Sequence, residues 1–180
     1  MCIRDRCVTG RSSPYAIYAG EGFGAFLEGL RGVYGRSITP TSTVPVIEMP
    51  LTGPGQADLG HGLTLRTMPA NHSGGALHLR FDYGGRSVVF SGDTGPSANL
   101  VTLSMNVDLL VCECAHSDEA ATARHLSPGA IESLARRAAP HSIWLTHFYP
   151  DVDASKALAT IGRSGVECRR ADDLDTWTAT

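Results

Sequence analysis

The sequence has no long apolar segment and no strong excess of one charge. No run of about 18 apolar residues occurs, so no segment shows the pattern of a membrane-spanning helix. With 15 Lys and Arg against 18 Asp and Glu, the formal net charge is -3, which argues against a protein that holds a polyanion by charge alone. Residues 1–6 are charged and lack an apolar stretch, so we expect no secretion signal.

Cysteines are few and scattered, at Cys2, Cys7, Cys112, Cys114 and Cys168. An odd number without a secretion signal favours reduced thiols, and we expect a cytoplasmic protein. Cys112 and Cys114 would share one face of a strand. They could form a metal or redox pair, but the apolar run before them favours buried small residues.

Apolar spacing predicts an α/β (α+β) domain with helices over a mixed sheet. Strands are predicted over residues 14–19, 44–49, 62–69, 76–83, 86–91, 107–111, 141–146 and 166–169. Helices are predicted over residues 21–34, 98–103, 127–139 and 154–161. Gly84-Gly85 is typical of a hairpin turn, residues 51–61 have a loop composition, and Ser127 is the expected cap of its helix. We expect residues 1–13 to be a non-native or disordered start, and residues 14–180 to belong to a single domain.

Three polar residues stand beside predicted strands: His72, Asp93 and His147. Asp93 and His147 come directly after apolar runs, and the carboxyl ends of strands are where α/β sheets collect catalytic groups. Two imidazoles and a carboxylate are suitable ligands for zinc, manganese or iron. An isolated histidine at a strand end is more often a polar edge residue, and Gly-Asp-Thr is more often a turn. The spacing alone therefore leaves both interpretations open.

Five motifs in a fixed order resemble the metallo-β-lactamase superfamily, most closely its ribonuclease Z-like branch. They are His72 before a strand hairpin, Ser-Gly-Asp-Thr at 91–94, Asp-Leu-Leu-Val-Cys-Glu-Cys at 108–114, His-Leu-Ser at 125–127 and Leu-Thr-His-Phe at 145–148. The resemblance extends over most of the chain from residue 14 onward. It implies a partial αββα sandwich whose cleft binds two metal ions, most often zinc, with manganese or iron as alternatives.

The resemblance also implies roles for individual residues. His72 corresponds to a ligand of one metal, His147 to a ligand of the other, and Asp93 to the carboxylate that bridges both. His125 corresponds to a histidine that donates a proton or stabilises an oxyanion, a role that suits its pKa range. Glu113 matches a glutamate of the same branch, although Cys112 replaces the histidine that usually precedes it. With Asp93, these two form the expected catalytic set.

Other readings of the histidines stay open. His125 could instead be a helix-start residue that makes a local hydrogen bond. His78 and His141 are expected on strands, whereas His61 and His116 are expected on the surface of loops.

The family's main metal-binding motif, His-x-His-x-Asp-His, does not occur in the sequence. We therefore expect the chain to be the C-terminal part of a domain whose parent is an enzyme, and to be inactive alone because too few ligands converge. The implied function is hydrolysis of phosphodiester or related ester bonds by a water molecule activated by two metal ions. The alternative is a non-catalytic binding module on the same fold.

Ribonuclease Z carries an arm that grips tRNA, inserted between the segments that match His72 and Asp93. Here the predicted hairpin of residues 76–91 fills that interval. We therefore expect a small-molecule ester or phosphodiester substrate rather than tRNA, with no membrane partner and with a homodimer left open.

Overall fold

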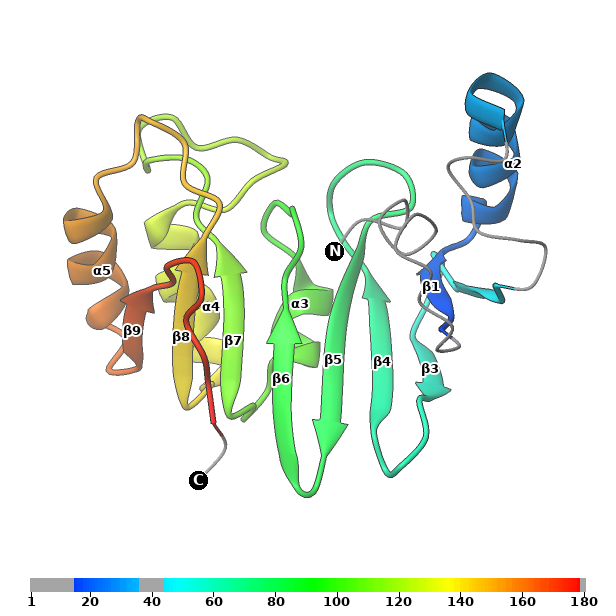
Figure 1. The fold of residues 1–180 in the computed structure, drawn as a ribbon. Coiled ribbons are helices and arrows are strands. Elements are labelled where there is room, and N and C mark those ends of the chain that lie inside the picture. Colours follow the sequence, from blue (N-terminus) through cyan, green and yellow to red (C-terminus); the bar gives the residue numbers. More distant parts are fainter. Residues whose placement is uncertain (1–14, 36–43, 179–180) are drawn as a thin grey trace.

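A seven-stranded mixed sheet forms the centre of the computed structural model, which describes residues 15–35 and 44–178. The strand order follows the chain, from β3 to β9 (Figure 1). The strands are β3 (Gly55–Asp58), β4 (Thr64–Pro69), β5 (Leu77–Tyr83), β6 (Arg86–Phe90), β7 (Leu109–Glu113), β8 (Ser142–Thr146) and β9 (Glu167–Arg170). Strands β3 to β6 are antiparallel neighbours, whereas β6 to β9 run parallel.

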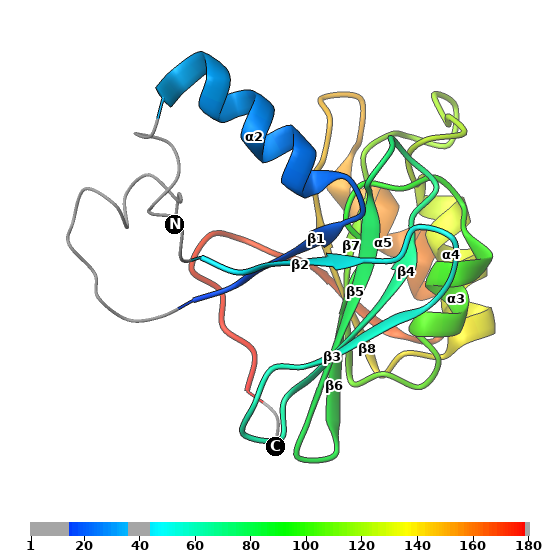
Figure 2. The same ribbon diagram turned by 90° about the vertical axis from the view of Figure 1, so that its right-hand side faces the viewer.

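The parallel strands are joined by helices, as parallel pairing requires. Helix α3 (Ala98–Leu103) connects β6 to β7, α4 (Pro128–Ala138) connects β7 to β8, and α5 (Ala154–Gly162) connects β8 to β9. All three lie on the same side of the sheet (Figure 2). The carboxyl ends of β6, β7 and β8 therefore meet at one edge, and the loops that follow them are brought together there.

A smaller unit precedes the large sheet. Strand β1 (Ile17–Gly20) pairs in parallel with β2 (Val46–Met49), and α2 (Phe23–Tyr34) lies between them in sequence. Helix α2 projects away from the large sheet (Figure 2). It exposes three large apolar side chains, Phe26, Val33 and Tyr34. Within residues 15–35 and 44–178, every helix is too short or too polar to span a lipid bilayer.

Most predicted elements are confirmed to within a few residues, and the hairpin turn is confirmed by positive φ angles of 57° at Gly84 and 79° at Gly85. Two predictions, one for a loop and one for a helix cap, are wrong. Residues 51–61 contain strand β3, which pairs with β4 although its sequence Gly-Gln-Ala-Asp has little strand propensity. Ser127 occupies the cap position of α4, but its side chain makes no capping hydrogen bond. The expected start at residues 1–13 lies outside the described residues.

The hydrophobic core lies between the sheet and helices α3, α4 and α5. It is built from alternate strand residues such as Val89, Leu110 and Ile143, each with no exposed surface. Cys112 and Cys114 are equally buried, which confirms the prediction that they are buried small residues. Burial disfavours the thiolate, so it raises the pKa of Cys114 to about 12 and that of Cys112 well above its usual range.

Candidate functional site

Loops at the carboxyl edge of the sheet carry the predicted site residues. Asp93 follows β6, Glu113 is the last residue of β7, and His147 follows β8 directly. His147 has a φ angle of 55°, a left-handed conformation that non-glycine residues adopt rarely and that recurs at functional sites. The local backbone is therefore held in an unfavourable state that turns the imidazole at the strand end.

Asp93 and His147 lie side by side at this edge. The Oδ1 atom of Asp93 is 3.0 Å from Nδ1 of His147. The two atoms are close, yet their orientation is not that of a hydrogen bond, and Nδ1 of His147 is buried without a hydrogen-bond partner. A buried ring nitrogen without a partner is costly. A cation between the nitrogen and the carboxylate would satisfy both, so this donor pair fits a metal ion.

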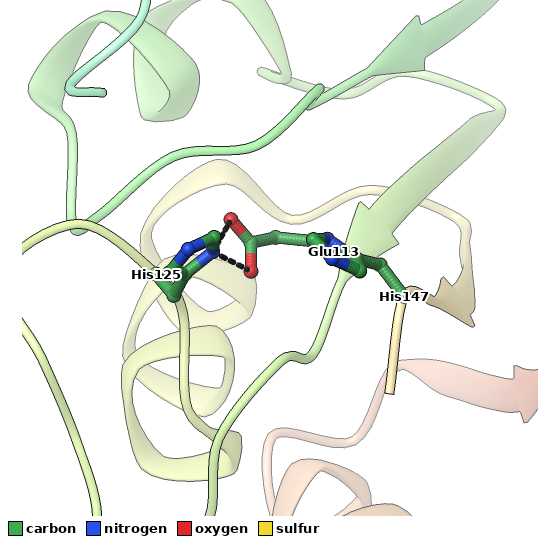
Figure 3. Close-up of side chains that lie close together, drawn as sticks. All are labelled: Glu113, His125 and His147. Atoms are coloured by element: carbon green, nitrogen blue, oxygen red, sulfur yellow. Dashed lines mark hydrogen bonds and ion pairs between the residues drawn. The ribbon is translucent and has the colours of Figure 1, made fainter. Parts of the chain in front are cut away.

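Glu113 and His125 form the second pair (Figure 3). Nδ1 of His125 is 3.2 Å and 3.1 Å from the two carboxylate oxygens of Glu113, and the Glu113 side chain is only 2% exposed. The backbone N–H groups of Thr94 and Leu126 also donate to this carboxylate. Because a carboxylate only accepts, Nδ1 of His125 carries the proton, and its Nε2 is left as the atom that can act on a ligand.

The histidine rings form one cluster. The ring centroid of His125 lies 5.0 Å from that of His72, 5.6 Å from that of His147 and 5.6 Å from that of His116. Nδ1 of His72 contacts the Ser73 hydroxyl at 3.1 Å. All of the predicted site residues are thus brought to one edge of the sheet, from loops that are far apart in sequence. Whether His72, Asp93 and His147 ligate metal stays a prediction.

Among the described residues, the group whose ligand atoms converge most closely is Glu113, His125 and His147, with these atoms within 4.8 Å of one another. This set differs from the predicted ligands, since it includes the catalytic pair in place of His72 and Asp93. Each Glu113 oxygen already accepts a backbone hydrogen bond and faces His125. We therefore read Glu113 as the group that orients His125, and His147 as the member suited to bind metal.

A close contact between loops holds these residues in place. The Asn71 side chain donates to the carbonyl oxygens of Pro96 and Ala123, both at 3.2 Å. At Gly95, an added Cβ atom would lie only 1.9 Å from the Ala123 carbonyl oxygen, so only glycine permits this approach. The loops that carry His72, Asp93 and His125 are therefore fixed relative to one another.

The other histidines depart in part from expectation. His78 lies on β5 as predicted and is fully buried, with Nδ1 2.6 Å from the Ser91 carbonyl oxygen. His141 is exposed and lies just before β8, so its placement on a strand was wrong. His61 is an exposed loop residue, as predicted. His116 was expected on a loop surface, but its ring packs into the cluster beside Tyr149, a residue that the sequence did not single out.

Comparison with known proteins supports the fold. The chain is similar to the metallo-β-lactamase fold protein YhfI from Bacillus subtilis, with 19% identity, a TM-score of 0.75, and coverage of 93% of this chain and 66% of that chain. It is also similar to human tRNase Z, short form, with 17% identity, a TM-score of 0.63, and coverage of 81% and 65%. The predicted α/β metallo-β-lactamase fold is therefore confirmed.

Sequence comparison assigns the family. Ribonuclease Z of Brevibacillus brevis is 40% identical over 101 residues, which are 50% of this chain and 32% of that protein. The chain thus spans about a third of the length of this curated relative. Residues 3–148 match the family described as Beta-lactamase superfamily domain. Because this match extends over most of the sequence, the chain belongs to the β-lactamase superfamily.

Proposed function

We propose that this chain carries part of the active centre of a metal-dependent hydrolase that cleaves phosphodiester or related ester bonds. The observation that carries the proposal is the buried Nδ1 of His147, which has no hydrogen-bond partner and lies 3.0 Å from the Asp93 carboxylate. A metal ion held there would lower the pKa of a water molecule and stabilise negative charge on the substrate. An imidazole with a carboxylate suits zinc first, and manganese or iron as alternatives.

The site residues of this chain have different proposed roles. Asp93 and His147 would hold one cation. His72, whose ring lies beside that of His125, would supply a ligand to a second cation that Asp93 shares. Glu113 fixes the tautomer and direction of His125, since its two oxygens face Nδ1. With its ring protonated on both nitrogens, His125 would donate the Nε2 proton to the leaving oxygen of the ester and keep the Nδ1 proton on the Glu113 side. Glu113 is a positioning residue, because it acts only through His125.

The proposal is tested by titrating the chain with zinc in a calorimeter. His147→Ala and Asp93→Asn should each weaken zinc binding by about tenfold or more, because each removes one donor. His141→Ala is the matched control, since His141 is exposed and lies outside the cluster. Zinc affinity that is the same in all four proteins would contradict the metal site and favour a binding module on the same fold.

We expect the zinc affinity of the unaltered chain to be modest, because the His-x-His-x-Asp-His ligands are absent from it. Tight binding of two zinc ions by the 180-residue chain would contradict this expectation. Hydrolysis of a chromogenic phosphodiester, measured on a protein that also contains that motif, is the complementary assay. There, His125→Ala should lower kcat by about a hundredfold or more.

The proposed substrate is a small ester rather than tRNA. Between His72 and Asp93, a range that the structure describes fully, the chain forms only the β5–β6 hairpin with its turn at Gly84 and Gly85. This hairpin leaves no inserted arm to hold a large RNA, and the net charge of -3 supplies no general basic surface in its place. Efficient processing of precursor tRNA, with steep salt dependence, would contradict this part of the proposal.

A further inference from the structure

Tyr149 is an aromatic side chain that the proposed chemistry does not use, although it lies against the histidine cluster. Its ring centroid is 4.8 Å from that of His116, 5.2 Å from that of His147 and 5.8 Å from that of His125. The residue is 39% exposed, whereas its neighbour Phe148 packs against the core. The Tyr149 ring therefore contacts the histidine cluster, and the residue still keeps surface that is open to solvent.

The backbone of Tyr149 is fixed rather than free. Its N–H donates to the Ala115 carbonyl oxygen at 3.1 Å, and its own carbonyl accepts from the N–H of Val152 at 3.0 Å. The first bond ties the loop after β8 to the segment after β7. The backbone of Tyr149 is therefore fixed, and its ring packs against three histidine rings. An aromatic ring packed in this way loses little entropy when it binds a ligand.

The His116 ring lies beside the ring of His125. Its Nδ1 is 3.4 Å from the Asp151 carboxylate, which in turn accepts from the Ser117 N–H at 2.9 Å. The side chain of His116 is 21% exposed, and its ring is close to those of both Tyr149 and His125. Two packed rings, one from each of two loops, thus stand next to the group proposed to protonate the leaving oxygen.

We propose that His116 and Tyr149 form a leaving-group subsite that selects a planar aromatic ring, such as an aryl group or a nucleobase. The inference rests on the proposed function, because it is His125 that locates the leaving group. An ester whose leaving oxygen meets Nε2 of His125 places the attached group beside these rings. Aromatic rings stack on such side chains and alkyl chains do not, which favours an aryl ligand by about tenfold.

The subsite is tested by measuring how tightly two phosphate monoesters bind to the chain in the presence of zinc. Phenyl phosphate and butyl phosphate carry the same charged group and differ in the shape of the attached group. We expect phenyl phosphate to bind about tenfold more tightly, as measured by calorimetry or by chemical-shift titration. Tyr149→Phe, which keeps the ring, should retain this preference. Tyr149→Leu, which keeps an apolar side chain without a flat ring, should abolish it.

Tyr83→Leu is the matched control, because Tyr83 is an exposed tyrosine at the end of β5 that faces no histidine ring among the described contacts. It should leave the preference unchanged. Equal binding of the two esters by the unaltered chain, or a preference that survives Tyr149→Leu, would overturn the subsite. A measurement of zinc binding distinguishes failure of the proposed subsite from failure of the proposed hydrolase function. If zinc binds and the preference is absent, only the subsite fails; if zinc does not bind at His147, the proposed function fails whatever the preference.

Discussion

The two faces of the large sheet carry similar apolar rows but differ in what covers them. On one face, Val89, Leu110 and Ile143 are completely buried under α3, α4 and α5. On the other, the aligned residues Phe90, Val111 and Trp144 are only partly covered, and Phe90 is 41% exposed. Helix α2 stands on the open side of the sheet in Figure 2, but Figure 1 shows it beyond the β3 edge rather than over β6, β7 and β8.

The difference shows that the strands carry apolar residues on both faces of the sheet, so that either face can pack against a covering layer. A sheet with one solvated face normally alternates apolar and polar residues, whereas strands buried on both faces read as continuous apolar runs. Strands β6 and β7 have the second pattern, Val-Val-Phe and Leu-Leu-Val. The Arg169 guanidinium, 3.7 Å from the Trp144 ring centroid, shields part of the open face by a cation–π contact. Stability should therefore depend on the covered face far more than on the open one.

The largest effect is expected at Leu110, in the centre of the covered face. Leu110→Ala should lower the free energy of unfolding by about 2–5 kcal/mol, because it removes buried methyl groups and leaves a cavity under the helices. Urea denaturation followed by circular dichroism measures this change. A loss below about 1 kcal/mol would mean that the helices do not pack on the sheet as described.

A matched pair on β6 compares the two faces directly. Val89 is fully buried on the covered face, whereas its neighbour Val88 is only partly buried on the open face. Val89→Ala should cost about 1–3 kcal/mol and Val88→Ala less than about 1 kcal/mol, since the same atoms are removed from different surroundings. Equal losses in urea denaturation would show that both faces are covered in solution.

Dye binding addresses the open face itself. An exposed apolar patch drives association and binds hydrophobic dyes. Phe90→Ser should reduce dye fluorescence and light scattering of the chain with a change in stability of about 1 kcal/mol or less, because the ring is already partly exposed. Met105→Ser is the control, since Met105 is 52% exposed but lies after α3. The interpretation would be contradicted by a monomeric chain that binds no dye before the substitution.

The sequence predicted the sheet edge better than the details of the site. Asp93 and His147 could be placed because each comes just past an apolar strand, and parallel strands end at a common edge. Strand β3 could not be predicted, because its pairing with β4 is a tertiary effect that overrides local propensity. His116 and Tyr149 were missed because their convergence depends on the packing of two loops. The one available signal was their proximity in sequence to Glu113 and His147.

The smallest expected effect is a pH dependence that originates on the covered face. His78 points to that side of β5, and its burial lowers the pKa of the imidazole, although the hydrogen bond to the Ser91 carbonyl opposes this. The folded protein therefore holds His78 neutral at pH values where the unfolded chain, with an ordinary pKa of about 6.5, becomes protonated. The contribution of His78 to stability is complete above that pH and is lost as the pH falls below it toward the lowered pKa of the folded state.

Urea denaturation at several pH values between 5 and 8 measures this dependence. His78→Gln keeps a polar side chain but cannot be protonated, so it should flatten the decline in unfolding free energy below about pH 6.5. His141→Gln should leave the decline unchanged, because His141 is exposed. Since His78 also contacts the Ser97 hydroxyl at 3.1 Å, His78→Gln should lower stability at pH 8 as well. A decline that is equally steep in His78→Gln would show that the titrating group is not His78.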